Sequence, residues 1–469
     1  MPKNMNKNKD KIKIAVIGAG ISGLSAAFWL NKNGYDVTIF EASNEPGGSM
    51  FTRSERGFLV DYGPNSGLET TPLIGQMVED IGLNDHMIYA SSSADKRYIL
   101  RNNQLFTLPT SPGAFLKTKL FSLKAKLRLL AEPFIGKSKD GYYQSISEFV
   151  TRRLGKEFLD YAINPFVAGV FAGDPDTLSV KSAFPKLYRL EELYGGLFKG
   201  LVLGSRERKK SAEQAKYRAR MFSFNKGMQA LPKAIADKFG EKIRYNCRVE
   251  KIIKTEKKFK VLFEQDDNLN ETSADIILSA IPAYKTALIF DDSQLSSHLN
   301  AIYYPPVKML YLGFNKADIG QPLDGFGFLI PEKEKKMFLG AIWSSTIFSN
   351  RTAEDMAAFT LFVGGARSPE LLDNDNDTLI HAVISEFKQI MNIGKDPVYV
   401  KDRLWPKAIP QYQLGYIEHE RDFERFEADN PGIFLSGNFR GGISVADCII
   451  NSESVCERIY TYMAQHVVP

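Results

Sequence analysis

The chain has 469 residues, 44% of them hydrophobic and 25% charged, a composition typical of a soluble globular protein with about two to four domains. Its formal net charge of +5 is local: residues 117–128 carry five basic side chains and no acid, and residues 206–220 carry seven basic side chains and two acids. Three cysteines outside any Cys-x-x-Cys pattern and five scattered histidines argue against a disulfide framework and a zinc or iron site, and no stretch approaches the roughly 18 apolar residues of a membrane span.

The first forty residues predict one β-α-β unit. Residues 1–13 are rich in Lys and Asn and lack the apolar run of a secretory signal, so we expect a disordered tail there. Residues 13–17 form a short, mostly β-branched apolar run that ends at a glycine, as a buried parallel strand does. A helical pattern follows over about 21–32, Gly34 ends it, and residues 35–40 predict the next strand.

The turn between this strand and this helix has the sequence Gly18-Ala19-Gly20-Ile21-Ser22-Gly23, and Glu41 stands at the end of the second strand. The glycines permit a close approach of backbone N–H groups to a pyrophosphate, the helix N-terminus favours its negative charge, and Glu41 can accept from a ribose hydroxyl. The glycine pattern alone is weak evidence, but strand, glycines, helix, strand and acid occur here in the required order. The sequence therefore predicts a dinucleotide site, with a chance glycine turn as the alternative.

Two further turns follow, Glu45-Pro46-Gly47-Gly48 and Gly63-Pro64-Asn65-Ser66. The paired glycines let the chain fold back beside the same cofactor, an extension that two-dinucleotide flavin folds commonly have and that an NAD site does not need. The second turn can bring backbone amides near an isoalloxazine ring. Taken alone each is only a turn, but after the first motif they favour FAD.

The middle of the chain alternates between helical and strand patterns. Apolar residues recur at helical spacing from 114 to 135, with lysines between them, and leucines repeat this spacing from 190 to 201. Another helix is expected at 379–391. Strands are expected in the region 244–264 and at 276–281, 303–314 and 337–345.

The last forty residues contain a third glycine-rich loop. A strand at 433–435 leads into Leu435-Ser436-Gly437-Asn438-Phe439-Arg440-Gly441-Gly442-Ile443-Ser444-Val445-Ala446-Asp447, and a helix is expected from about 445 to 462. This arrangement supplies another helix N-terminus, which we expect at the far end of the cofactor. A simple strand-to-helix turn is the alternative.

With these motifs in place, the chain resembles the flavin monoamine oxidase superfamily, and within it the oxygen-dependent protoporphyrinogen oxidases. The similarity runs from the first strand to the last helix. The segment Asn164-Pro165-Phe166-Val167-Ala168-Gly169-Val170-Phe171-Ala172-Gly173-Asp174-Pro175 is typical of these porphyrinogen oxidases and not of amine oxidases. Further matching segments are 325–331, 340–345, 348–351 and 362–366.

The resemblance implies an α/β fold with a Rossmann-like FAD-binding domain of the two-dinucleotide-binding type, an α+β substrate domain and a helical subdomain. The FAD-binding domain is expected to be discontinuous, formed by residues 1–95, 205–285 and 395–469. The substrate-binding domain is expected at 96–112 and 286–394, and the helical subdomain at 113–204. The basic amphipathic stretches of this subdomain suit a surface that lies on a membrane, and a solvated basic face is the alternative.

The resemblance also implies non-covalent FAD. Its contacts fall on the glycine-rich segments and their flanks: Gly18, Ala19, Gly20, Ile21, Ser22, Gly23, Glu41, Ala42, Gly48, Ser49, Gly63, Pro64, Asn65, Ser66, Val249, Trp405, Ile443, Ser444 and Val445. Substrate contacts are implied at Gly169, at Leu329 and Phe348, which match positions that sandwich the tetrapyrrole, and at Arg97, whose guanidinium could clamp a propionate. Without the resemblance, Arg97 is a surface salt-bridge partner and Leu329 and Phe348 are core residues. No metal and no catalytic side chain is implied, because flavin N5 carries the chemistry.

The implied function is an FAD-dependent oxidase of haem biosynthesis that converts protoporphyrinogen IX to protoporphyrin IX, with O₂ as acceptor and H₂O₂ as product. Oxidation of coproporphyrinogen III to coproporphyrin III is the alternative. The family removes a hydride from a methylene bridge to flavin N5, so the protein's task is to orient an apolar, carboxylated disc. The few cysteines suit a cytoplasmic protein, free or on the inner face of the membrane, and a homodimer is one option for its assembly.

Three other functions fit the same fold. An amine oxidase would use Lys308, which lies near the place where that group has a lysine beside flavin N5. Against it, no flavin-linking cysteine stands near Trp405, and Ser49 follows the paired glycines where amine oxidases usually have arginine. A carotenoid-type desaturase takes another apolar substrate, and a GDP-dissociation-inhibitor-like protein binds proteins and carries no flavin.

Overall fold

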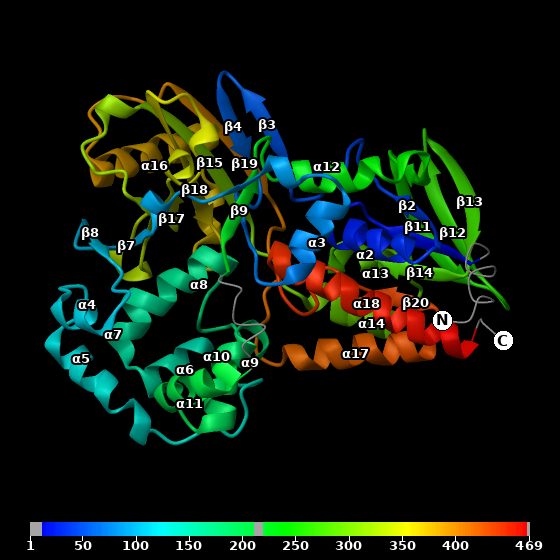
Figure 1. Cartoon of the computed structure of the whole chain (residues 1–469), viewed down its shortest axis with the longest axis horizontal. Coiled ribbons are helices and arrows are strands. Elements are labelled where there is room, and N and C mark those ends of the chain that lie inside the picture. The colour runs from blue at the N-terminus through cyan, green and yellow to red at the C-terminus, as the bar shows by residue number, and fades with distance from the viewer. Residues whose placement is uncertain (1–11, 211–218, 467–469) are drawn as a thin grey trace.

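The computed structural model describes residues 12–210 and 219–466. The disordered tail expected at 1–13 therefore lies almost wholly outside the described residues, as does the 211–218 part of the second basic segment. Two sheets dominate the fold, one parallel and one mixed, and a group of helices lies next to the mixed sheet (Figure 1).

The parallel sheet has five strands in the order β10-β2-β1-β14-β20, with β1 at its centre. Alternate residues of β1 enter two different cores, because Ile14 and Val16 pack on one face and Ala15 and Ile17 on the other. This is the predicted Rossmann-like sheet. Its strands are β1 (Lys13–Ile17), β2 (Asp36–Phe40), β10 (Ile243–Arg244), β14 (Ile276–Ser279) and β20 (Ile433–Leu435).

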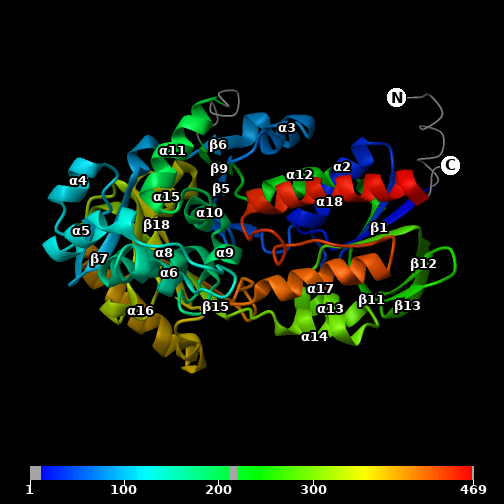
Figure 2. The same cartoon turned by 90° about the horizontal axis from the view of Figure 1, so that it is seen from below.

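Further elements cover both faces of the parallel sheet (Figure 2). One face packs against α2 (Ile21–Lys32), α3 (Pro72–Asp80), α12 (Ala230–Asp237) and α18 (Val445–His466). The other face packs against α13 (Ala283–Ile289), α14 (Ser293–Ala301), α17 (Tyr416–Asp429) and the antiparallel sheet of β11 (Cys247–Lys254), β12 (Phe259–Gln265) and β13 (Asn268–Ala274). The predicted first and last helices are both present.

The mixed sheet has seven strands in the order β19-β15-β18-β17-β16-β7-β8, and α16 (Asn376–Met391) packs on one face of it. Only β16 and β7 pair in parallel. Its strands are β7 (Lys96–Arg101), β8 (Gln104–Thr107), β15 (Val307–Asn315), β16 (Gly325–Leu329), β17 (Gly340–Ile342), β18 (Met356–Gly364) and β19 (Tyr399–Trp405). β19 falls in the range 395–469, which the predicted division gives to the cofactor-binding domain, yet it pairs with β15 in this sheet.

The strand predicted at 337–345 is shorter than expected. Only Gly340–Ile342 pairs with its neighbours, and α15 (Ser344–Ile347) begins directly afterwards. The backbone leaves the strand at Trp343, whose carbonyl then accepts the N–H groups of Thr346 and Ile347. The strand expected at 303–314 likewise begins only at Val307.

The helix predicted over 114–135 is divided into two short helices, because two residues between them turn inward. α4 (Pro112–Lys117) and α5 (Leu123–Leu130) are capped by Ser111 and Ser122, and Leu120 and Phe121 are buried between them. The leucines of 190–201 also belong to two helices, α10 (Pro185–Tyr194) and α11 (Leu197–Lys210), separated by Gly195 in the left-handed region. The other helices of this region are α6 (Ile146–Arg153), α7 (Lys156–Phe158), α8 (Asn164–Phe171) and α9 (Val180–Ala183).

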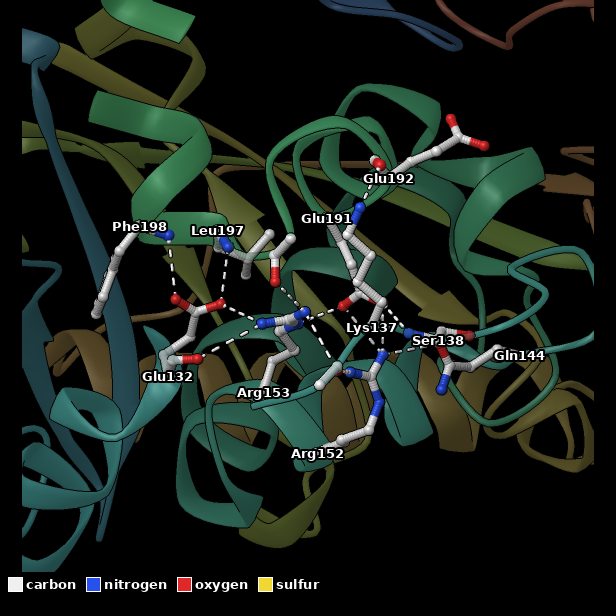
Figure 3. A network of polar contacts seen from close by, with 12 residues as sticks. Glu132, Lys137, Ser138, Gln144, Arg152, Arg153, Glu191, Glu192, Leu197 and Phe198 are labelled. Atoms are coloured by element: carbon white, nitrogen blue, oxygen red, sulfur yellow. Dashed lines mark hydrogen bonds and ion pairs between the residues drawn. The ribbon is translucent and has the colours of Figure 1, made fainter. Parts of the chain in front are cut away.

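A buried ionic network holds these helices together (Figure 3). The Arg153 guanidinium is fully buried and pairs with Glu132 at 2.8 Å and with Glu191 of α10. Glu132 also accepts the N–H groups of Leu197 and Phe198 at 2.7 and 3.1 Å, at the start of α11. A buried cation is thereby neutralised, and the first amides of α11 have an acceptor.

Two small antiparallel sheets complete the described fold. One pairs β3 (Thr52–Glu55) with β4 (Phe58–Asp61), and the other has the order β5 (Gly67–Leu68), β9 (Met221–Phe224), β6 (Met87–Tyr89). Within the described ranges, no helix combines the length and the apolarity needed to cross a bilayer. In the same residues, no three His, Cys, Asp or Glu side chains gather as metal ligands would.

Candidate functional site

The first glycine turn lies between the end of β1 and the start of α2. A Cβ on Gly23 would stand 2.0 Å from the carbonyl oxygen of Gly18, so the turn can close only around glycine there. A Cβ on Gly20 would meet no atom within 4 Å, so this part of the turn faces open space. No side chain in the described part of the chain caps α2, and its first turn holds no acid, which leaves its N-terminal amides and positive dipole end for an external anion.

Glu41 stands directly after β2 and is bound to the glycine turn. One carboxylate oxygen accepts the N–H of Ala19 at 2.7 Å, and the other accepts the N–H of Ser43 at 2.8 Å. Each oxygen keeps a further lone pair that can accept from a hydroxyl. The Glu41 carbonyl accepts the N–H of Cys247 at 2.8 Å, which brings the start of β11, and with it Val249, to the same edge of the sheet.

The paired glycines fold back onto this turn, as expected from the sequence. The Gly47 N–H donates to the Ala19 carbonyl at 2.9 Å, and a Cβ on Gly48 would stand 3.4 Å from the Cα of Gly20. The turn at 63–66 packs against the residue after the paired glycines. A Cβ on Gly63 would stand 1.9 Å from the Ser49 carbonyl oxygen, so the two backbone segments are in direct contact. Residues 18–23, 47–49 and 63 therefore form one continuous backbone surface.

The C-terminal loop (residues 436–444) reaches the same place from the other end of the chain. α18 lies beside α2 (Figure 1), and the Ser452 hydroxyl donates to the Ser22 carbonyl at 2.8 Å. Ser444 caps α18, since its hydroxyl oxygen accepts the Asp447 N–H at 3.1 Å. The N-terminal glycine turn and the C-terminal loop thus converge on the same place, as predicted from the sequence. The buried Ser436 hydroxyl, at the end of β20, has no hydrogen-bond partner among residues 12–210 and 219–466.

The turn at 63–66 also contacts the mixed sheet. The Asn65 side-chain amide donates to the Thr360 hydroxyl of β18 at 3.2 Å, and Thr360 contacts the Ser344 hydroxyl of α15 at 2.9 Å. The Trp405 indole N–H donates to the carbonyl of Tyr62 at 2.9 Å, one residue before the turn. The predicted flavin turn is therefore held between the two main sheets.

A buried ion pair lies behind this turn, and sequence reasoning did not find it. The Arg351 guanidinium pairs with the Asp61 carboxylate at 2.9 Å, and both side chains are only 1% exposed. Arg351 also donates to the Asn65 carbonyl at 3.4 Å, and its guanidinium lies 5.0 Å from the Phe348 ring centre. Burial raises the pKa of Asp61, and the adjacent guanidinium opposes this shift. Arg351 thus links the predicted flavin turn to a predicted substrate residue.

The four predicted substrate residues fall into two groups. The Arg97 guanidinium is exposed and lies 5.4 Å from the Phe326 ring centre, and Phe326 packs against the cluster that contains Phe348. Leu329 belongs to a different cluster, with Ile99 and Tyr161. A Cβ on Gly169 of α8 would stand 2.6 Å from the Leu329 side chain, so Gly169 lets α8 approach the end of β16. The structure therefore places Arg97 near the Phe348 cluster, by way of Phe326, and packs Gly169 against Leu329.

Lys308 lies away from the predicted cofactor residues. Along β15, Met309 and Tyr311 pack in the cluster that Trp405 contacts, while Leu310 and Leu312 pack towards α16. Because side chains alternate along a strand, Lys308 points to the α16 side. There its ammonium pairs with Asp402 at 3.1 Å and contacts Asn376. The position that suggested an amine oxidase lysine is occupied by a structural ion pair.

The cysteines of the described chain are not activated as nucleophiles. All three are buried, and burial raises the pKa of Cys247 and Cys448 to about 11. What the site offers is a backbone surface of glycine turns, two helix N-termini and one acceptor carboxylate. These features fit the diphosphate and ribose of a dinucleotide cofactor.

Comparison with known proteins agrees with this geometry. The family model described as flavin containing amine oxidoreductase matches residues 21–460. The chain is 32% identical to protoporphyrinogen oxidase 2, chloroplastic/mitochondrial, of Arabidopsis thaliana, over 96% of this chain and 94% of that protein. It is 29% identical to coproporphyrinogen III oxidase of Staphylococcus aureus, over 95% of this chain and 98% of that protein.

Solved structures share the fold. A protein described as a protoporphyrinogen oxidase from Exiguobacterium sp. 255-15 superposes with a TM-score of 0.79 at 21% identity, covering 96% of this chain and 99% of that one. Putrescine oxidase with bound putrescine superposes with a TM-score of 0.69 at 15% identity, covering 96% and 99%. At such identities the likeness shows the fold alone, an α/β architecture with a Rossmann-like sheet and a second, mixed sheet.

Proposed function

The chain belongs to the flavin containing amine oxidoreductase family, and from this premise we propose that it is an FAD-dependent porphyrinogen oxidase of haem biosynthesis that acts on protoporphyrinogen IX. The observation that carries the proposal is the convergence of the glycine turns at the N-termini of α2 and α18, fixed by the bond from Ser452 to Ser22. The relatives that cover almost the whole chain are porphyrinogen oxidases.

We assign the FAD contacts to the stacked backbone segments. The amides of 18–23 and the start of α18 at Val445 would hold the diphosphate, and Glu41 would accept from the ribose. The turn at 63–66 and Trp405 would line the isoalloxazine end, where Arg351 and Thr360 hold Asn65 in place. FAD, once bound, supplies the acceptor for a hydride and the route of electrons to O₂ with release of H₂O₂.

We assign the substrate to the side of the mixed sheet that carries Arg97. Its guanidinium is exposed, makes a single long hydrogen bond within the described residues, to the Asp95 carbonyl at 3.4 Å, and can bind a propionate through two N–H groups. Phe348 and Leu329 would pack against the macrocycle from two clusters, with Gly169 shaping the Leu329 side. These residues would orient the substrate, and the reaction would require no side chain as a proton acceptor.

Coproporphyrinogen III is the second candidate substrate, because the Staphylococcus aureus relative named for it is almost as similar to this chain as the plant protein. The two porphyrinogens differ at two ring positions, where one carries vinyl groups and the other propionates. The pocket rim must therefore distinguish an apolar substituent from a charged one.

Turnover of both porphyrinogens by the purified holoenzyme tests the proposal. We expect the flavin absorbance of bound FAD, fluorescent porphyrin and H₂O₂ from protoporphyrinogen IX, and a kcat/KM at least about tenfold lower for coproporphyrinogen III, since a misplaced charge in an apolar rim costs more than 1.4 kcal/mol. The reverse preference would establish the second candidate. H₂O₂ from amines alone would indicate an amine oxidase, and a colourless protein that FAD cannot reconstitute would favour a binding protein.

A further inference from the structure

The C-terminal loop is rich in glycine, and the hydrogen bond within it, from the Arg440 N–H to the Gly437 carbonyl at 3.0 Å, closes one turn. Gly437, Gly441 and Gly442 adopt φ values of 133°, 74° and 134°, which side chains other than glycine rarely tolerate. Glycines pay the largest conformational entropy cost on ordering. The Asn451 side chain of α18 donates to the Arg440 carbonyl at 2.7 Å, and the rest of the loop, up to the cap of α18, must be held by other groups outside it.

Two tyrosine hydroxyls supply this restraint. The Tyr412 hydroxyl donates to the Asn438 carbonyl at 2.8 Å and accepts the Gly442 N–H at 2.9 Å, so one oxygen ties together the two sides of the loop. The Tyr416 hydroxyl donates to the Phe439 carbonyl at 2.6 Å. The two side chains are 3% and 1% exposed, and their ring centres lie 4.5 Å apart.

The tyrosines are themselves anchored from several directions. The Tyr412 carbonyl accepts the Ser179 N–H at 2.9 Å, and the preceding Gln411 side chain donates to the Phe171 carbonyl at the end of α8. Tyr416 is the first residue of α17, so its backbone belongs to a helix that packs on the parallel sheet. Burial raises the pKa of both phenols well above the usual value, so both hydroxyls stay neutral donors.

We propose that Tyr412 and Tyr416 are positioning residues that hold the C-terminal loop in the cofactor-receiving shape before FAD arrives. The inference rests on the proposed function, because it takes the loop to bind FAD. A loop held in advance does not lose its freedom on binding, so the hydroxyls contribute to FAD affinity without touching the cofactor. Tyr412, with two bonds on opposite sides of the loop, contributes more than Tyr416.

The competing interpretation is that the two rings only fill the core. Tyr412→Phe and Tyr416→Phe keep the ring and remove the hydroxyl, so they separate the two roles. Tyr460→Phe is the matched control, because the Tyr460 hydroxyl also accepts from one group, the Asn33 amide at 2.8 Å, and donates to one carbonyl, that of Trp29 at 3.2 Å. Tyr460 lies on α18 and contacts the C-terminal end of α2, away from the loop.

The experiment is a fluorescence titration of the deflavinated full chain with FAD, combined with visible circular dichroism of the reconstituted flavin. We expect the FAD dissociation constant to rise about tenfold or more for Tyr412→Phe and about threefold for Tyr416→Phe, with altered flavin dichroism, and to be unchanged for Tyr460→Phe. Thermal unfolding of the three apoproteins shows whether the losses of stability are comparable.

Three outcomes would decide against the inference. Wild-type affinity in Tyr412→Phe, with FAD binding normally to the wild type, would overturn the inference and leave the proposed function standing. An equal rise in the dissociation constant for Tyr460→Phe would show a general loss of stability instead of positioning. A wild-type chain that binds no FAD would overturn the proposed function and the inference together.

Discussion

Glu41 is the residue whose geometry makes the sharpest single-site prediction. Its two carboxylate oxygens each accept a backbone N–H, from Ala19 and Ser43. In Glu41→Gln the amide NH₂ must face one of these donors, so either the buried Ala19 N–H or the less buried Ser43 N–H loses its acceptor. We predict that the free energy of unfolding of the apoprotein falls by about 1–3 kcal/mol and that the FAD dissociation constant rises about tenfold. Urea unfolding and FAD titration measure the two effects.

Glu264→Gln is the control for this substitution. Glu264 lies on β12, is 36% exposed and pairs with Arg248 at the surface, so its change should leave both quantities near those of the wild type. If Glu41→Gln binds FAD as tightly as the wild type, the carboxylate does not face the cofactor, and the ribose contact assigned to it is wrong.

The residues of the candidate site that could be predicted are those whose proposed role follows from their local backbone. Gly18 and Glu41 stand directly after two strands, and Gly23 in the first turn of the helix between them, all of which a short stretch of sequence already predicts. Tyr412 and Arg351 could not be found in this way, because their partners, the Gly442 amide and the Asp61 carboxylate, come from other parts of the chain. Of the observations on the sequence, only the family resemblance over residues 348–351 pointed to the region of Arg351.

At the scale of elements, the buried parallel strands were predictable and the helical region was not. A parallel strand covered on both faces is a continuous apolar run, so its limits appear directly in the sequence. The apolar spacing over 114–135 is the same for one helix or for two. The break is caused by Leu120 and Phe121, which pack against Ile99 and Tyr161 from elsewhere in the chain.

The contact between α14 and α17 makes the protein's stability depend on pH. His298 and His419 share a hydrogen bond between their Nδ1 atoms at 2.9 Å, so at least one imidazole must be neutral. Burial, and then the charge of His298, lower the pKa of His419 below its usual 6.5, while Glu418 and Asp422 oppose this shift. The unfolded chain therefore binds more protons than the folded chain just below pH 6.5.

The sign of the effect follows from this difference in bound protons. The free energy of unfolding is unaffected by this histidine above pH 6.5 and decreases as the pH falls from 6.5 through the lower folded-state pKa. We predict that His419→Gln weakens this decrease between pH 7.5 and 5.5, as urea unfolding would measure. His381→Gln, on α16, is the control and should keep the wild-type slope. If His419→Gln keeps the wild-type dependence of unfolding free energy on pH, the loss of stability at low pH comes from other groups.

At the scale of the whole molecule, the helical region presents an apolar surface on the stretch whose basic, amphipathic pattern suggested contact with a membrane. An amphipathic helix of a globular protein usually packs its apolar face on the core, yet Leu123, Leu127 and Leu130 of α5 are 72%, 59% and 67% exposed. Leu116 of α4 and Phe134 beyond α5 are 68% and 89% exposed. The five basic residues of 117–128 are interleaved with these side chains. We propose that this surface rests on an anionic membrane, which would bury the leucines and attract the lysines.

Flotation with vesicles of phosphatidylcholine and phosphatidylglycerol tests this proposal on the full chain. We predict that the wild type floats with the vesicles at low salt and less so at high salt, because salt screens the lysines. Leu123→Glu/Leu127→Glu should remain in the unbound fraction, since burying each leucine contributes about 1.5–3 kcal/mol and each carboxylate is repelled by the lipid. Leu269→Glu/Leu288→Glu adds the same charge at leucines 69% and 74% exposed outside the helical region, so it should float as the wild type does. A wild type that stays unbound at low salt, or equal loss in both double variants, would show that these leucines face solvent and do not bind lipid.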